Sequence, residues 1–315
     1  MRTFILFMLM GLILSAGVMI PFAGGIFFLA EFVTSANILL VVSLWALGYA
    51  LEAFLFGFVT GDYSWIDRLW SILPVFFTWY YAYRSIAENG AGALAVCTAA
   101  ALVTLWGIRL TFNFARKGGY KGLEDYRWIY LRKKITNPVL WQLFNFSFIC
   151  LVQSGLFVLF TFPVYSLTFI TAESLPVLFW VLAAIGFIFI CLEFVSDQQQ
   201  WNFHAAKKAA ADKKDYPSKY SIDVNNGFLS KGLFALSRHP NYFCELGFWW
   251  IIWLAAFSLY GNPITSGVFG PFILTLIFVG STILTESITS SKYPEYKNYK
   301  KRVISQIIPW FPKKS

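Results

Sequence analysis

Long blocks of apolar residues, separated by short turns and a few polar loops, make up most of this chain. A helix of about 20 apolar residues is long enough to cross the hydrocarbon core of a bilayer. The pattern predicts about eight spans, or seven if the first is lost or peripheral, at 3–32, 38–60, 65–83, 92–114, 143–170, 175–194, 242–260 and 267–284. We therefore expect an all-α, polytopic transmembrane helix bundle, with a bend at Pro21 in the first span.

Positive charge gathers in three polar regions. Twenty-one of the 25 Lys and Arg residues lie at 116–134, 207–238 and 292–314, seven in each region. Because positively charged loops stay on the cytoplasmic side of a membrane, we expect all three regions to face the cytosol. They follow the fourth, sixth and eighth predicted spans, so the N-terminus is expected on that side as well. The organelle is left open, with the endoplasmic reticulum expected in a eukaryotic cell.

Composition narrows the kinds of partner and site. Hydrophobic residues make up 58% of the 315 positions and charged residues only 13%, far from the balance of a soluble domain. The Lys and Arg residues that give the net charge of +9 lie mostly in the three regions expected on the cytosolic side. Membrane topology therefore accounts for the positive charge, which does not indicate a nucleic acid partner. The four cysteines form no C-x-x-C pair and only two histidines occur, which argues against a disulfide framework and against a metal site.

The densest polar chemistry lies at 237–245, where a long loop meets an apolar run. Pro240 suits the first turn of a helix. A helix that begins there places Asn241, Glu245 and Trp249 on one face. A carboxylate at the edge of the hydrocarbon is costly and indicates a functional site. The alternative is an interfacial helix start whose polar side chains reach back to water.

Two other polar patterns stand out. Glu193, Asp197 and Gln200 recur at i, i+4 and i+7, which predicts one polar stripe on the sixth span. A polar helix end is the simpler interpretation of that stripe. The loop at 115–141 is basic but contains an acidic and aromatic run at 124–127, and Arg109 is expected to be buried near the basic end of the fourth span.

Several motifs, in this order along the chain, resemble those of one known family. The run L-S-R-H-P-N-Y-x-x-E at 236–245, followed by Trp249 and Trp250, resembles the C-terminal half of the steroid 5-alpha-reductase superfamily, and within it a branch of largely uncharacterised multi-pass proteins. Supporting motifs are D-x-x-W-x-x-x-P at 67–74, L-W-G-x-R-L at 105–110, E-D-Y-R at 124–127, E-x-x-x-D-x-Q at 193–199, Y-P-E-Y-x-x-Y at 293–299 and I-P-W at 308–310. We expect an extra N-terminal span at 1–34 and a reductase-like transmembrane domain at 35–315.

The resemblance implies a helical fold whose cytosolic loops and C-terminal helices enclose NADPH, which would reduce a C=C bond of a lipid or sterol-like enone. Asp67 and Trp106 would hold the catalytic positions, where the steroid reductases have a longer acidic residue and a tyrosine. An indole donates one hydrogen bond but cannot supply a proton as a phenol does. By motif position, the residues that would bind the cofactor are Glu193, Asp197, Arg238, His239, Asn241, Tyr242 and Glu245.

Two other functions are compatible with these patterns. The R-H-P-x-Y run also resembles isoprenylcysteine and phospholipid methyltransferases, which bind S-adenosylmethionine. Glu193 with Asp197, and Asp67 with the 124–127 run, favour the reductase. The third alternative is an inactive lipid-binding membrane protein, whose polar stripes hold helices together. No G-x-G-x-x-G follows a strand, so a Rossmann domain is excluded as the dinucleotide site.

Overall fold

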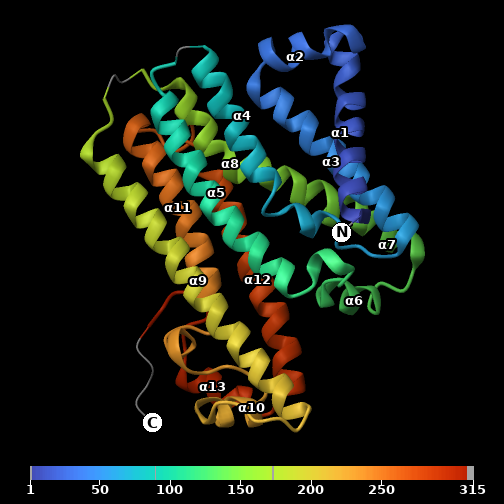
Figure 1. Ribbon diagram of the computed structural model, residues 1–315, viewed down its shortest axis with the longest axis vertical. Helices are drawn as coiled ribbons and strands as arrows, with labels where there is room; N and C mark the ends of the chain where they lie inside the picture. The colour runs from blue at the N-terminus through green and yellow to red at the C-terminus, as the bar shows by residue number, and fades with distance from the viewer. Residues whose placement is uncertain (1, 89, 172–173, 311–315) are drawn as a thin grey trace. The chain divides into compact units, whose positions relative to one another are not determined.

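The computed structural model describes residues 2–88, 90–171 and 174–310, and the described residues form helices and loops without a strand (Figure 1). The α-helices in chain order are α1 (Arg2–Ala23), α2 (Leu29–Ser35), α3 (Ile38–Thr60), α4 (Leu73–Ala87), α5 (Ala93–Arg116), α6 (Tyr126–Arg132), α7 (Pro138–Phe144), α8 (Gln153–Ser166), α9 (Val177–Ala211), α10 (Ser221–Asn226), α11 (Pro240–Tyr260), α12 (Phe269–Lys292) and α13 (Tyr296–Arg302). A π-helix at Asn145–Val152 joins α7 to α8.

Seven of the described helical segments are long and apolar enough to cross a membrane. They are α1, α3, α5, the continuous run Pro138–Phe169, α9, α11 and α12. The prediction of an all-α, multi-pass membrane protein is therefore confirmed. The predicted boundaries at 38–60 agree with α3, whereas α9 is 35 residues long and continues well past the predicted end at 194.

The predicted span at 65–83 is wrong. The chain there forms a 3-10 turn at Ile66–Leu69 and then the 15-residue helix α4. A helix of that length covers about 22 Å, less than the roughly 30 Å of a bilayer core. Arg68 holds the turn in place, because it donates to Oδ2 of Asp62 at 2.5 Å and to the carbonyl of Gly119 at 3.0 Å. The pattern of apolar residues along the chain cannot reveal such contacts between distant residues.

The first apolar run is also divided differently. Pro21 lies inside α1, which continues two residues further and ends at Ala23. Gly24 and Gly25 follow with φ of 78° and 141°, values that L side chains rarely adopt. The run at 3–32 is therefore divided between α1 and α2, which are separated by these glycines and a 3-10 turn at Ile26–Phe28, rather than one helix bent at Pro21.

Small residues let α1 lie close against α3 (Figure 1). A Cβ at Gly11 would collide with the ring of Tyr49, and a Cβ at Gly48 would collide with Ser15. Ser15 also donates a hydrogen bond of 3.2 Å to the carbonyl of Trp45. Close approach through glycine and serine is the usual way that helices pack in lipid, where the hydrophobic effect between helices is absent.

The chain divides into two compact units, the first comprising Met1–Ala183 with Ile252–Pro271 and the second Ala184–Ile251 with Phe272–Ser315. The basic regions begin near the ends of α5, α9 and α12, at Arg116, Lys207 and Lys292. Their cytosolic orientation stays a prediction, and Lys313 and Lys314 lie outside the described residues.

Candidate functional site

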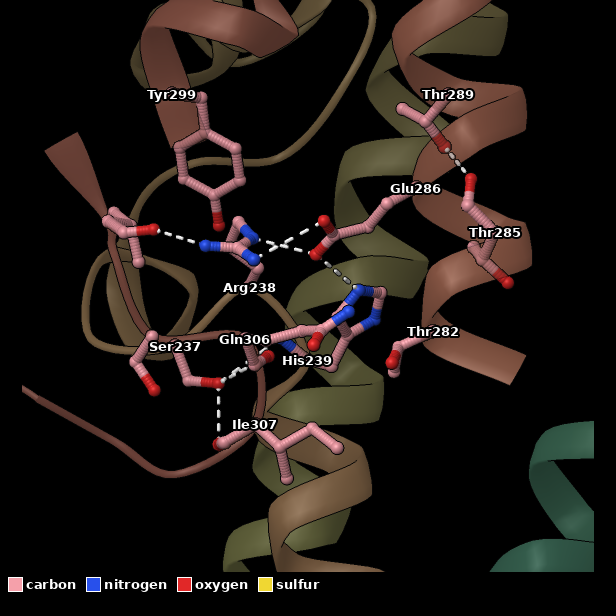
Figure 2. Close-up of polar contacts among 12 residues, drawn as sticks. Ser237, Arg238, His239, Thr282, Thr285, Glu286, Thr289, Tyr299, Gln306 and Ile307 are labelled. Atoms are coloured by element: carbon pink, nitrogen blue, oxygen red, sulfur yellow. Dashed lines mark hydrogen bonds and ion pairs between the residues drawn. The ribbon is translucent and has the colours of Figure 1, made fainter. Parts of the chain in front are cut away.

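A buried ion cluster forms where the chain enters α11 (Figure 2). Nε of Arg238 donates to Oε1 of Glu286 at 2.7 Å, and Nη2 donates to Oε2 at 3.3 Å. Nε2 of His239 lies 3.2 Å from the same Oε1. Arg238 and Glu286 each expose only 9% of their side chains, so one carboxylate on α12 neutralises the guanidinium away from water.

The C-terminal segment after α13 completes this cluster. Nη1 of Arg238 donates to the carbonyls of Val303 and Ile304, both at 2.7 Å. The backbone N–H groups of Arg238 and His239 donate to the carbonyls of Ser305 and Gln306 at 3.1 and 3.0 Å. Figure 2 shows Arg238 between Glu286 and this segment. Arg238, which was predicted to bind the cofactor, thus already has an intrachain carboxylate and two carbonyls as partners.

α11 begins at Pro240, the residue predicted from its ring geometry. Nε1 of Trp249 donates to Oε1 of Glu245 at 3.1 Å, which confirms that these residues share one face. The ring of Tyr242 stacks on His239, with ring centroids 5.4 Å apart. Asn241 is half-buried at the same helix start. The motif therefore forms the start of α11, where the ring of Tyr242 and the carboxylate of Glu286 hold the imidazole of His239 in place.

The remaining predicted cofactor residues lie on α9. Glu193 and Asp197 are both buried, one helical turn apart, and Gln200 is half-buried. The polar stripe is therefore part of a continuous helix and is largely removed from water. A carboxylate pair in such a position is costly unless it has partners or a ligand, and its role toward a cofactor stays a prediction.

In the first unit, Asp67 is the centre of a second polar network. Nε1 of Trp128 donates to Oδ2 of Asp67 at 2.6 Å. Removal from water raises the pKa of Asp67 from 3.8 to about 6, and the nearby charge of Asp125 adds to the rise. Arg127 and the hydrogen bonds from Trp128 and Ser64 act in the opposite direction. Near neutral pH this carboxyl can therefore change its protonation state.

The acidic and aromatic run at 124–127 packs onto the same turn. The backbone N–H of Tyr63 donates to Oε1 of Glu124 at 3.2 Å, and the N–H of Asp125 donates to Oγ of Ser64 at 2.8 Å. Asp125 in turn pairs with Arg127 at 2.8 Å. Two motifs about sixty residues apart in the sequence thus meet in one network, which the motif order along the chain could not show.

Trp106, the second predicted catalytic residue, is fully buried on α5 and packs edge-on against Phe160. Trp70 packs against the same ring and donates a 2.5 Å hydrogen bond to Oε1 of Gln153. Asp67 accepts a hydrogen bond from Trp128 on α6. Arg109, on the same helix as Trp106, is buried as predicted.

Three residues that the structure brings to notice were not among the predicted site residues. Trp128 had no signal beyond its place directly after the 124–127 run. Glu286 lies two residues beyond the predicted last span at 267–284, and its pairing with Arg238 was not predicted. Glu52 was visible as a lone acid in an apolar run. It is fully buried on α3, and neither carboxyl oxygen makes a hydrogen bond of ordinary length and angle to the described residues. Among those residues no cluster of three or more potential metal ligands occurs.

Comparison with known proteins identifies relatives of this chain. A family model described as a protein of unknown function (DUF1295) matches residues 53–303. An uncharacterized protein of the fission yeast Schizosaccharomyces pombe is 34% identical over 254 residues, which cover 78% of this chain and 72% of the yeast protein. No solved structure matches the chain.

Proposed function

Because the chain belongs to this family of proteins of unknown function, we propose its activity from geometry and motif resemblance: it is a membrane oxidoreductase, related to the steroid 5-alpha-reductases, that uses NADPH to reduce a C=C bond of a lipid or sterol-like enone. The observation that carries the proposal is the Asp67 carboxyl, which is withdrawn from water and held by Trp128. Its raised pKa suits a group that must act on a substrate ketone near neutral pH.

Asp67 supports the substrate side of the reaction. As the enone accepts hydride, negative charge develops on its ketone oxygen, and a hydrogen-bond donor placed there lowers the barrier. A protonated Asp67 can donate from one oxygen while Trp128 holds the other. Asp67 thus offers the proton that the indole of Trp106 cannot supply.

The start of α11 supports the cofactor side. Bound NADPH would supply the hydride, and the chain would bind it, orient it and exclude water. Asn241, Tyr242 and His239 offer an amide, a phenol and an imidazole for a nicotinamide or an adenine. Since Arg238 is held by Glu286 and by the C-terminal segment, its role in this arrangement is to fix the helix start. Arg238 could bind a phosphate only if it gave up its bonds to Glu286 and to the C-terminal segment.

The methyltransferase alternative rests on the R-H-P-x-Y run at 238–242. Asp67 has no evident part in methyl transfer, which is why the reductase remains our proposal.

The test is a binding titration of the detergent-purified protein with NADPH and, in parallel, with S-adenosylmethionine. We expect NADPH to bind, and Asn241→Ala and Glu245→Gln each to weaken binding at least tenfold, the equivalent of about one lost hydrogen bond to a charged group. Asn298→Ala is the matched control, because this exposed amide on α13 bonds only locally to Glu295.

Each result of the titration has a defined meaning. NADPH binding that survives both substitutions at α11 contradicts the site assignment. Binding of S-adenosylmethionine alone would transfer the same residues to the methyltransferase function. A folded sample that binds neither compound would overturn both enzymatic proposals and leave the lipid-binding alternative.

A further inference from the structure

The segment that follows α13 presents large apolar side chains to the outside. Ile304, Ile308 and Trp310 are 54%, 69% and 69% exposed. All three lie beyond Lys292, where the last membrane-spanning helix ends. The passage of that helix through the hydrocarbon therefore does not account for their exposed apolar side chains. Several large apolar groups exposed together on a short segment mark an interaction surface.

Hydrogen bonds hold this segment beside the residues that precede α11. The N–H groups of Arg238 and His239 donate to Ser305 and Gln306, and the N–H of Trp310 donates to the carbonyl of Leu236 at 2.9 Å. Because α11 begins to span at Pro240, the exposed side chains lie at the level where that helix enters the membrane. Tryptophan is enriched at this depth of a membrane protein.

The inner side of the segment is firmly anchored. Val303 is buried in a cluster with Phe228, Tyr296 and Tyr299. Oγ of Ser237 adds a hydrogen bond of 2.7 Å to the carbonyl of Ile307. The segment therefore has two sides, an inner one fixed by hydrogen bonds and packing and an outer one that carries the apolar groups.

Positive charge flanks the apolar groups. α13 carries four cationic side chains, Lys297, Lys300, Lys301 and Arg302. Lys300 is partly buried and the other three are exposed. The acidic residue at the start of the helix, Glu295, is engaged by Asn298. A cationic helix next to exposed isoleucine and tryptophan matches the chemistry of an anionic membrane surface, which offers phosphates above an acyl layer.

We propose that residues 304–310 form a C-terminal interfacial anchor, which inserts Ile304, Ile308 and Trp310 into the headgroup layer of the leaflet where α11 begins, while the cations of α13 contact anionic lipid headgroups. The same segment supplies the carbonyls that hold Arg238. Contact with the lipid surface thus supports the start of α11 from outside the protein. The anchor does not depend on the chemistry assigned to the site.

The test places the full-length protein in nanodiscs that contain phospholipid brominated close to the headgroup, which quenches nearby tryptophan. One set is pure phosphatidylcholine and the other an equal mixture with phosphatidylglycerol. The contribution of Trp310 is the difference between the wild type and Trp310→Phe. Trp180→Phe is the control, because Trp180 is 44% exposed within the span α9 and should respond equally to both lipids.

We expect Trp310 to be quenched, and more strongly in the anionic nanodiscs. The variant Lys300→Gln/Lys301→Gln should lower the ratio of inserted to free anchor in anionic lipid roughly 25-fold, since each of the two cations near such a surface contributes about fivefold. A Trp310 that is unquenched in both lipids overturns the anchor. Quenching that is equal in both lipids and indifferent to the lysine substitutions overturns the role of the cations. Trp310 shielded by a second copy of the chain, detected as a cross-linked dimer, would also contradict the proposal.

Discussion

The indole N–H of Trp128 donates a 2.6 Å hydrogen bond to Oδ2 of Asp67, which lies 61 residues earlier in the chain. The bond favours the ionised carboxyl, while removal from water favours the protonated one. The balance leaves the pKa of Asp67 at about 6, near the pH at which a proton donor or acceptor is most useful.

Replacement of Trp128 by phenylalanine should raise the pKa of Asp67 further, by roughly one unit. The change removes the N–H donor but keeps an aromatic ring, and a hydrogen bond to a charged group contributes about 1.5 kcal/mol, close to one unit of pKa. Infrared titration of the carboxyl band, with Asp67→Asn to identify the band, measures the shift. An unchanged titration in Trp128→Phe would show that this hydrogen bond does not control the carboxyl.

The stability of the protein should depend on pH through Asp67. Its pKa is 3.8 when exposed and about 6 in the folded protein, so the unfolded chain releases this proton at lower pH than the folded one. The contribution of Asp67 to stability is therefore complete below about pH 4 and is lost as the pH rises through about 6. Thermal unfolding of the wild type and Asp67→Asn should diverge over that interval, and parallel pH profiles would contradict the shifted pKa.

Loss of the Glu286 charge should destabilise the second unit. Glu286→Gln leaves Arg238 buried without its counterion, and such a change typically costs about 3–5 kcal/mol. Glu88→Gln is the comparison, because Glu88 is 55% exposed, so water screens its pairing with the buried Arg84 and a smaller loss is expected. Denaturant unfolding in detergent compares the two variants.

A double substitution separates charge from packing in the same pair. Arg238→Met/Glu286→Met removes both charges, so it should recover much of the stability lost in Glu286→Gln. A double variant as unstable as the single one would mean that the hydrogen bonds from Arg238 to the C-terminal segment, rather than the ion pair, hold this region together.

The contact between α1 and α3 should tolerate alanine at one glycine and not at another. Gly11→Ala places a Cβ against Tyr49 and Glu52, so we expect a loss of about 1–3 kcal/mol. A Cβ at Gly17, on the same helix, would have nothing within 4 Å, and alanine there should be neutral or stabilise by up to about 1 kcal/mol. Thermal unfolding tests both, and equal effects of the two substitutions would rule out close packing at Gly11.

Glu52→Met should stabilise the first unit. Both oxygens of Glu52 are buried, and neither makes a hydrogen bond of ordinary length and angle to the described residues; an unsatisfied buried polar group costs about 1–3 kcal/mol. The measurement is again thermal unfolding, with Glu52→Gln as the control that keeps a polar group of the same size. A less stable Glu52→Met protein would show that the carboxyl has a stabilising partner.

Sequence patterns within one helix predicted the parts of the site that depend on residues close together in the chain. Pro240 begins α11 because its fixed φ and missing N–H suit a first helical turn. Glu245 and Trp249 meet because residues four apart share a helix face. The same periodicity predicted that Glu193 and Asp197 lie together on one helix. Their roles toward a cofactor stay predictions.

The sequence by itself determined that this protein is a multi-pass helical membrane protein, because the free energy of placing a helix in lipid is a sum over the residues of that helix. Only the tertiary structure decided that 65–83 is a turn and a short helix, that Trp128 holds Asp67, and that Glu286 neutralises Arg238 from 48 residues away. Those contacts depend on how distant segments pack. Neither hydropathy nor helical periodicity carries information about which distant side chains meet.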